Sequence, residues 1–266
     1  MTKYAAPIIG MNGPKGGVGK SMMSAVFASW CSCHHLKTLL VDTDYGFGKL
    51  ENLLNVDVEY RLTDYFAKDL PLKRIISHLS DHLHLIAAGH GLVSMANTAA
   101  SYLGGFLLDL ELLRDEYDLI IIDSASGIHA QQLESLKFID YNIMVTTPDV
   151  LSIVDTLYFI KLARQISPSI EHMVLMNRVV DEKGALKIVE ELGLALNQMN
   201  VTSPALAGLI YDDKMLGLSQ IPDDVDLVRF MHKKNKDNFD SLRQKLQQNL
   251  VMRNHRRDKM QSDLRL

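Results

Sequence analysis

The chain has 266 residues, 47% of them hydrophobic, and a formal net charge of −4 at pH 7. That apolar content excludes global disorder, and the near-neutral charge argues against attraction of the whole chain to nucleic acid, although local patches stay open. The length favours one α/β domain of the doubly wound kind with room for a C-terminal extension. The sequence shows neither a secretory signal pattern nor an apolar run near the ~18 residues of a membrane-spanning helix. We therefore expect a cytoplasmic protein.

A strand, a glycine-rich loop and a helix are predicted at the start of the chain. The apolar run Pro7–Met11 leads into G-P-K-G-G-V-G-K-S at Gly13–Ser21, and a helix-compatible run begins at Met22. Glycines let the backbone fold around an anion, and the loop N–H groups and the helix N-terminus attract negative charge. The pattern predicts a phosphate-binding loop, in which Lys20 contacts the β- and γ-phosphates and the Ser21 hydroxyl binds Mg²⁺. The residues predicted to contact the nucleotide here are Gly16, Gly17, Val18, Gly19, Lys20, Ser21 and Met22.

Two residues of this loop depart from the general pattern. Pro14 stands where a glycine is usual, and its missing N–H costs little if the phosphate cradle begins at the next residue. That next residue is Lys15, a second lysine placed five residues before Lys20. An ordinary loop of this kind does not need it.

Two further predicted strands end in carboxylates. Lys37–Asp42 is a short apolar run followed by Thr43 and Asp44, and Asp118–Asp123 is the clearest strand of the chain. Ligands of open α/β sheets bind at the carboxyl ends of the strands. A helix cap or a turn is the alternative for a single aspartate, but two spaced by one residue favour a ligand site. The second run has the form of a Walker B strand, whose Asp123 helps to hold Mg²⁺ through water.

The remaining predicted elements alternate between helices and strands. A short helix is expected near Arg61–Phe66, with Thr63 or Asp64 as its cap. The alternation predicts βαβ units, a mostly parallel sheet and helices on both faces. We expect one domain over residues 1–228 and a helical basic tail over residues 229–266. The other predicted elements are a glycine turn at Ala88–Gly91, helices at Leu103–Leu113, Leu151–Ile166 and Asp181–Met199, and strands at His84–Ala87, Asn142–Thr147, Met173–Asn177 and Leu206–Ile210.

Cysteine and histidine side chains offer a metal site as an alternative feature. Cys31 and Cys33 are followed by His34 and His35, and these are zinc-ligand types. Residues i and i+2 do not face each other on a helix, however, and no second pair stands at a ligand-like spacing. We therefore favour buried or half-buried cytosolic thiols. The connection that holds His78, His82 and His84 is a weaker case, and we expect no metal there.

The tail carries an amphipathic stripe. Phe239, Leu242, Leu246 and Leu250 are spaced by three or four residues, as on one face of a helix. Basic residues lie on or just beyond it, namely Arg243, Lys245, Arg253, Arg256, Arg257 and Lys259. This combination is typical of a helix that lies on an anionic membrane. The alternative is that the stripe packs on the core of the preceding domain.

The lysine pair of K-G-G-V-G-K-S, Lys15 and Lys20, resembles the deviant Walker A motif of the MinD/ParA ATPases, which are P-loop NTPases of the SIMIBI type. The similarity runs from about Ile8 to Val228. Within that group, four stretches are similar to the flagellar-number ATPases called FlhG or FleN, namely Leu39–Asp44, Ile86–Gly91, Asp118–Ile128 and Val145–Asp149. The resemblance implies a doubly wound, mostly parallel sheet and the binding of ATP and Mg²⁺.

The resemblance also implies catalytic and metal-binding roles. Lys15 would reach the nucleotide of the partner subunit in an ATP-bound sandwich dimer, Lys20 would hold the phosphates, and Asp44 would orient the attacking water. The residues on the Mg²⁺ side would be Ser21, Asp42 and Asp123.

Further roles follow from the later motifs. Asn177, with Arg178 beside it, matches the asparagine that reads adenine, so the resemblance implies ATP rather than GTP. Ser124–Gly127 matches the second switch segment. Tyr45 and Lys49 depart from the residues that are usual in the first switch, which puts that end of the switch in question.

The leading functional prediction is a MinD-like, slow, partner-stimulated ATPase that dimerises on ATP and controls the number or placement of flagella. Its expected partners are a second copy of itself, a protein of a flagellar or polar machinery, and an anionic membrane through the tail, at the inner face of the cell membrane. One alternative is a ParA-type partition or cargo-positioning ATPase that binds DNA nonspecifically. Another is an interaction protein that binds nucleotide with negligible hydrolysis.

Overall fold

The computed structural model describes residues 5–44, 48–89, 99–214, 216 and 231–263, with side chains throughout except at 99–102, 131 and 249–263. Its centre is one eight-stranded sheet in the order β3-β4-β2-β5-β1-β6-β7-β8. All neighbouring strands run parallel except β3, which is antiparallel to β4. The strands are β1 Ile8–Asn12, β2 Thr38–Asp42, β3 Ser77–His78, β4 Leu83–Ile86, β5 Leu119–Asp123, β6 Tyr141–Thr146, β7 Glu171–Val179 and β8 Ala205–Tyr211.

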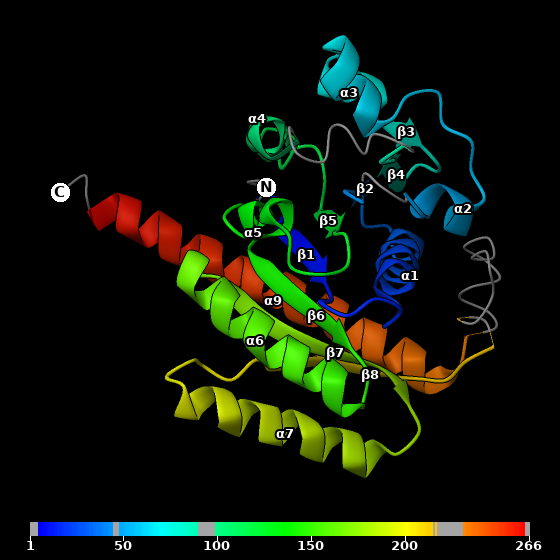
Figure 1. The fold of residues 1–266 in the computed structure, drawn as a ribbon. Coiled ribbons are helices and arrows are strands. Elements are labelled where there is room, and N and C mark those ends of the chain that lie inside the picture. The colour runs from blue at the N-terminus through cyan, green and yellow to red at the C-terminus, as the bar shows by residue number, and fades with distance from the viewer. Residues whose placement is uncertain (1–4, 45–47, 90–98, 215, 217–230, 264–266) are drawn as a thin grey trace.

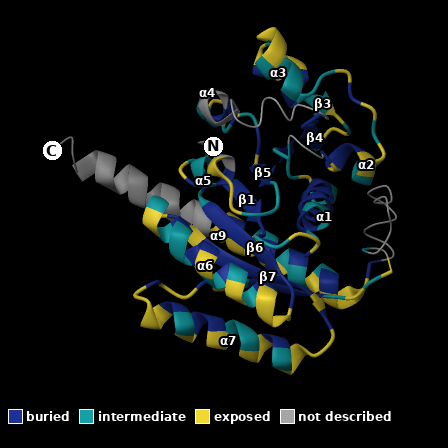
Figure 2. Ribbon diagram, viewed as in Figure 1, coloured by how far each residue is buried: buried dark blue, intermediate teal, exposed yellow. Residues whose placement is uncertain are grey.

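Helices cover both faces of this sheet (Figure 1). Alternate strand residues face opposite sides: Ile8 joins the cluster under α4, α6 and α7, whereas Ile9 joins the cluster under α1 and α9. The strands are therefore buried on both sides, as parallel strands between two helical layers must be, and the outer helix faces carry the exposed residues (Figure 2). The helices are α1 Lys20–Cys33, α2 Leu50–Leu54, α3 Leu62–Lys68, α4 Ala99–Glu111, α5 Ala130–Ser135, α6 Val150–Ile166, α7 Glu182–Gln198 and α9 Lys233–Asp263, with a 3₁₀ helix at Leu72–Ile75.

The doubly wound fold is confirmed, and three local features differ from expectation. The predicted caps of α3 were wrong: Arg61 holds the N-cap position, and its N–H donates to Asp64 Oδ2 over 2.9 Å, so Asp64 is the third helical residue. The helix starts at Leu62, the residue after this N-cap, and the Leu62 side chain is buried in the core. The two-residue strand β3 and the short helix α5 were not predicted, since neither is long enough to show a period.

The first half of the tail helix belongs to the core of the fold. Phe239, Leu242 and Leu246 are 0%, 0% and 3% exposed, and the ring of Phe239 lies 6.0 Å from that of Phe27 in α1. These three residues therefore follow the core-packing alternative. The side chains from Leu250 onward, and the predicted boundary at residue 228, lie outside the described residues.

Helix α9 also covers the edge of the sheet. Asn235 Oδ1 accepts the N–H of Tyr211 over 2.8 Å, and Asn238 Oδ1 accepts that of Leu209 over 3.0 Å. An open strand edge is a template for unwanted pairing, so these asparagines satisfy backbone groups that β8 would otherwise expose. Among the described residues, no helix combines the length and the apolar character needed to cross a membrane.

Candidate nucleotide site

The loop and both aspartate motifs meet at the carboxyl edge of the sheet. Strand β5 lies between β1 and β2, and Asp123 is in register with Met11 on one side and with Asp42 on the other. The phosphate loop therefore leaves β1 directly beside the two carboxylates. Parallel strands with adjacent carboxyl ends produce this convergence, as the sequence predicted.

The loop is a tight turn that ends at the start of α1. Gly17 and Gly19 have φ values of 81° and 92°, in the left-handed region that favours glycine. A Cβ on Gly19 would also collide with Nδ2 of Asn177. Helix α1 begins at Lys20, so its first N–H groups and its positive dipole end face the anion that the loop would enclose.

Lys20 lies buried against the Walker B aspartate. Its Nζ is 2.8 Å from Asp123 Oδ1, which also accepts a hydrogen bond from Ser24 Oγ over 2.8 Å. The two charged side chains are 4% and 1% exposed. A buried charge pair costs desolvation energy that a pair of apolar residues would avoid, so its presence at the end of the loop points to a charged ligand.

The same aspartate fits the predicted Mg²⁺. Oδ2 of Asp123 is buried and has no hydrogen-bond partner within the described part of the chain. The Ser21 hydroxyl lies on the same side, 3.4 Å from Lys20 Nζ. Magnesium prefers such oxygen ligands together with water and phosphate. Ser21 and Asp123 would therefore hold the ion, and the predicted role of Asp42 on the Mg²⁺ side stays a prediction.

Asp42 shapes the turn that carries Asp44. One of its carboxylate oxygens accepts the N–H of Asp44 over 2.9 Å, and the other accepts those of Lys49 and Leu50 over 3.0 and 3.2 Å. Burial, and then the neighbouring Asp123, raise the pKa of Asp42. A nearby cation would favour its charged form. Tyr45 lies outside the described residues.

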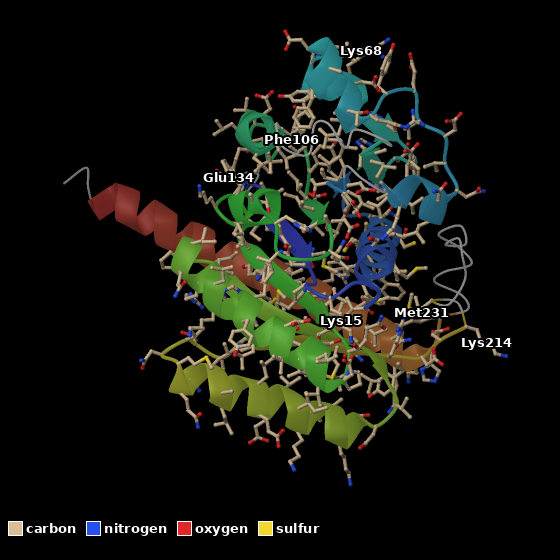
Figure 3. The ribbon with its side chains drawn as sticks, viewed as in Figure 1. Lys15, Lys68, Phe106, Glu134, Lys214 and Met231 are labelled. Atoms are coloured by element: carbon tan, nitrogen blue, oxygen red, sulfur yellow. The ribbon has the colours of Figure 1, made fainter. Side chains whose placement is uncertain are left out.

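Lys15 is held by its own chain. Its Nζ lies 2.7 Å from Oδ1 of Asp149, the N-cap of α6. Lys15 is labelled in Figure 3. The Lys15 ammonium, together with hydrogen bonds from Thr147 and Ser152, holds the pKa of Asp149 well below its usual range. The carboxylate also accepts the Ser152 N–H over 3.1 Å, so it caps the helix and anchors the lysine at once.

A cavity of about 270 Å³ opens beside the start of α1. It brings together four residues predicted to contact the nucleotide, Gly19, Met22, Asn177 and Arg178. Asn177 donates from Nδ2 to Val18 O over 2.9 Å and accepts the Arg178 N–H at Oδ1, so its amide also braces the loop. The role of Asn177 in reading adenine stays a prediction.

The sequence reasoning missed the other residues that line this cavity, which are Met23, Tyr211, Asp212, Asp213 and Leu216. Most of these follow the end of β8, the last parallel strand. The signal was present, because Tyr211-Asp212-Asp213 stands at the carboxyl end of a predicted strand. Its distance from the loop in sequence concealed the contact.

Several of the cysteines and histidines considered as metal ligands have packing partners within the fold. Cys31 is buried within α1, and burial raises the pKa of its thiol. His78 stacks on His84 with ring centroids 3.9 Å apart, and His84 Nδ1 lies 2.8 Å from the Tyr117 hydroxyl. His78 and His84 thus pack against each other on the paired strands β3 and β4 at the edge of the sheet.

Comparison with known proteins places the chain in a family. A family model described as an AAA domain matches residues 6–175, more than half of the chain. The chain belongs to this AAA-domain family. The matched range contains the phosphate loop, both aspartate motifs, and Asp149 with its partner Lys15.

Two curated proteins are similar to this chain in sequence. The antiactivator FleN of Pseudomonas aeruginosa is 24% identical over 174 residues, which cover 65% of this chain and 62% of FleN. The flagellum site-determining protein YlxH of Helicobacter pylori is 29% identical over 161 residues, which cover 60% of this chain and 53% of YlxH. The matches thus span little more than half the length of these relatives.

The fold is shared with solved structures. The septum site-determining protein MinD of Pyrococcus horikoshii, complexed with Mg-ADP, has a TM-score of 0.72 at 20% identity, covering 89% of this chain and 94% of that one. Together the matches confirm the predicted resemblance to MinD/ParA-type ATPases close to FlhG and FleN.

Proposed function

We propose that this chain is a Mg²⁺-dependent ATPase of the MinD type that dimerises on ATP, hydrolyses it slowly, and responds to a protein partner. The observation that carries the proposal is the placement of the two loop lysines. Lys20 lies inside the site, buried on Asp123, while Lys15 lies at the mouth of the loop on Asp149. One lysine is thus placed for the chain's own phosphates, and the other is accessible to a second copy.

The chemistry follows from positioning and charge. Phosphoryl transfer requires neutralisation of the phosphate oxygens and an aligned nucleophile. Lys20 and the loop N–H groups bind the phosphates, Asp44 orients the attacking water, and Lys15 adds positive charge to the partner's site. Mg²⁺, held on the side of Ser21, Asp42 and Asp123, would neutralise further charge on the phosphates.

We propose flagellar number or placement as the process this switch controls. Support comes from the relatives, one of which is described as a flagellum site-determining protein. A protein of the flagellar or polar machinery would read the ATP dimer. The chain would act in the cytoplasm and at the inner face of the cell membrane.

We propose that only the second half of the tail helix contacts a membrane. Phe239, Leu242 and Leu246 pack on the core, so the apolar side of the first half of α9 is not available to a bilayer. Arg243 also contacts Asp240 over 3.1 Å, and Lys245 donates to Leu206 O over 3.0 Å. Membrane contact would therefore fall to the residues after Gln248, of which four are among the basic residues named above.

This restriction defines the variant for a liposome test. A chain that ends at Asp237 would lose part of the core, whereas a chain that ends at Gln248 keeps it. We expect the full-length ATP dimer to sediment with anionic liposomes at low salt and the shortened chain to stay in solution, because each basic residue contributes on the order of 1 kcal/mol near such a surface. Equal sedimentation of both proteins would reject the membrane role and favour DNA or a protein cargo.

Hydrolysis itself is tested with two variants. Lys20→Ala should lose ATP binding, since it removes the buried phosphate cation. Asp44→Ala should bind Mg-ATP with the parent affinity. In a single-turnover assay its bound ATP should stay unhydrolysed. Hydrolysis by Asp44→Ala at the parent rate would show that another group orients the water, and no turnover by the parent with any candidate partner would support the interaction protein instead.

A further inference from the structure

A chain of four buried polar side chains crosses the sheet next to the candidate site. Gln132 of α5 donates from Nε2 to Asn12 Oδ1 over 2.9 Å. Asn12, the last residue of β1, donates from Nδ2 to Asn142 Oδ1 of β6 over 2.8 Å. Asn142 Nδ2 lies 3.0 Å from Nδ1 of His172 in β7. The four residues are at most 5% exposed.

In this four-residue network, each side chain donates its hydrogen bond to the next, from Gln132 toward His172. Burial lowers the pKa of His172 to about 4, so the ring is neutral at pH 7 and its Nδ1 can accept the N–H of Asn142. The Asn142 oxygen then accepts from Asn12, and the Asn12 oxygen accepts from Gln132. Because Gln132 donates from Nε2, its amide oxygen Oε1 stays available as an acceptor at the first residue of this side-chain network.

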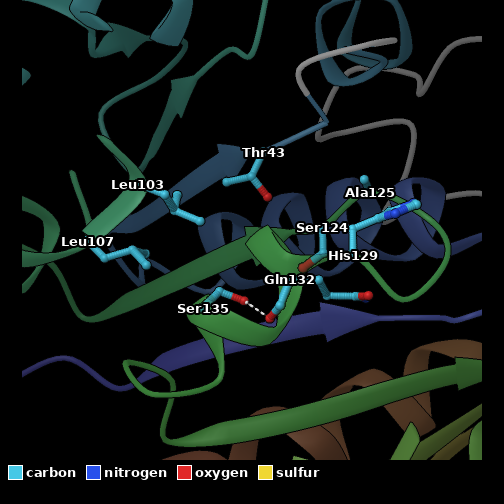
Figure 4. A pocket seen from close by; sticks show the side chains of 8 residues that line it. All are labelled: Thr43, Leu103, Leu107, Ser124, Ala125, His129, Gln132 and Ser135. Atoms are coloured by element: carbon cyan, nitrogen blue, oxygen red, sulfur yellow. Dashed lines mark hydrogen bonds between the residues drawn. The ribbon is translucent and has the colours of Figure 1, made fainter. Parts of the chain in front are cut away.

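Gln132 also lines a small cavity. Oε1 of Gln132 and Oγ of Ser124 are both buried and find no hydrogen-bond partner among the residues that the structure describes. Both residues line one cavity of about 10 Å³ between α5, α4 and the end of β5 (Figure 4). A space of this order holds one water molecule, which needs at least two polar partners. Ser124 and Gln132 supply them.

The two ends of this connection belong to the nucleotide site. Ser124 follows Asp123, whose carbonyl oxygen accepts both the N–H and the hydroxyl of Thr43 over 2.9 Å. At the other end, Asn12 precedes Gly13, the first residue of the phosphate loop. Gln132 therefore offers a side-chain connection between the segment after Asp123 and the strand that carries the loop, in addition to the direct bond from the Ser124 N–H to Met11 O over 3.3 Å.

We propose that Gln132 is a positioning residue which, through one water bound to Ser124, holds the segment after Asp123 in register with the phosphate loop. The proposal rests on the ATPase function proposed above. A buried polar network costs more than an apolar core of the same shape unless every member is satisfied, and Nε2 of His172 also has no partner among the described residues. Leucine at position 132 would in addition leave Asn12 Oδ1 without its donor. The network provides fixed geometry, and fixed geometry matters for hydrolysis more than for binding.

The test compares hydrolysis with binding in matched variants. Gln132→Leu keeps the side-chain volume and removes the amide, and Ser124→Ala removes the hydroxyl at the other side of the water. We expect each to slow single-turnover hydrolysis about 10-fold, with the dissociation constant of a fluorescent ATP analogue changed by less than about 2-fold. The double variant should be no slower than the slower single variant, because both act through one water.

Two further variants separate positioning from packing. Ser124→Thr keeps the hydroxyl and should recover the rate lost in Ser124→Ala. Ser135→Ala removes a hydroxyl from the same cavity wall, one that donates to the main-chain oxygen of Gln132 over 2.7 Å, and should keep the parent rate. Equal losses of binding and hydrolysis, or equal losses in all the alanine variants, would overturn the proposal.

A second measurement does not depend on hydrolysis. In the nucleotide-free protein, Gln132→Leu should speed amide hydrogen exchange in residues 124–133 and leave exchange in α7 unchanged. If the parent proves unable to hydrolyse ATP, the proposed function fails, and this exchange measurement still decides the role of Gln132. Unchanged exchange in residues 124–133 would overturn the proposal.

Discussion

Nζ of Lys15 lies 2.7 Å from Oδ1 of Asp149, so the lysine predicted to act on a second copy is paired within its own chain. The two side chains are 37% and 46% exposed, which places the ion pair at the surface. Exposed pairs contribute about 0–1 kcal/mol. The pairing is therefore weak enough for the phosphates of a second subunit to displace it.

Removing the charge of Asp149 should strengthen the ATP dimer. Asparagine caps a helix about as well as aspartate, so Asp149→Asn keeps the start of α6 and releases Lys15. We expect the dissociation constant of the ATP dimer to fall up to about 5-fold, the equivalent of about 1 kcal/mol. Sedimentation equilibrium on the Asp44→Ala background measures it. A weaker dimer would mean that Asp149 itself contacts the partner.

Gly19→Ala should destabilise the folded chain even without nucleotide. The new Cβ would sit at φ 92° and meet Asn177 Nδ2. Such backbone strain costs about 1–3 kcal/mol, measured as the free energy of unfolding in urea. Gly16→Ala is the matched control, because a Cβ there meets no atom within 4 Å and its φ is not positive. Equal stabilities of the two variants would contradict the loop geometry.

Phe239→Ala should show that α9 is part of the core. The ring is fully buried between α1 and the sheet, and truncation of such a ring costs about 3–5 kcal/mol. Ser241→Ala, an exposed change on the same helix, should stay within about 0.5 kcal/mol of the parent. A small effect at Phe239 would mean that the tail helix leaves the core in solution and would revive the membrane role of the whole stripe.

Acid should weaken the fold through His172. Burial, and then the charge of Arg164, lower its folded pKa to about 4, against about 6.5 in the unfolded chain. The unfolded state therefore binds the proton first, and stability present above about pH 6.5 is lost as the pH falls toward 4. The loss from this group approaches about 3 kcal/mol.

The contribution of His172 is isolated by comparison with His172→Gln, which keeps an acceptor for Asn142. The gap in unfolding free energy between parent and variant should shrink from pH 7 to pH 4.5. His84, whose pKa burial also lowers to about 4, contributes to both proteins equally. A gap that is constant with pH would show that His172 titrates normally in the folded state.

The sequence predicted the parts of this molecule that repeat or follow a fixed spacing. The buried strands that end at Asp42 and Asp123 could be predicted because each is an apolar run. Their parallel arrangement places both carboxylates beside the loop. The glycines and Lys20 were legible because a phosphate loop needs those residue types at fixed spacing.

Contacts between segments that are distant in the sequence could not be predicted from the sequence. Nothing in the sequence joins Lys15 to Asp149, or Asn12 to Gln132, because each residue is an ordinary polar side chain in its own segment. The strand end at Tyr211 carries no motif that links it to the loop. It lines the cavity because of the position of β8 in the sheet. Phe239 and Leu242 were compatible with a membrane or a core, and the packing of α9 on α1 decided between them.

The central claim is that ATP joins two copies of this chain through Lys15. The most direct measurement is the solution mass of the hydrolysis-blocked Asp44→Ala protein by analytical ultracentrifugation with Mg-ATP, with Mg-ADP and without nucleotide. We expect a dimer with Mg-ATP, a monomer in the other two states, and a return to monomer when Lys15→Ala is added. The same mass under all three conditions, with ATP binding shown in parallel, would contradict it.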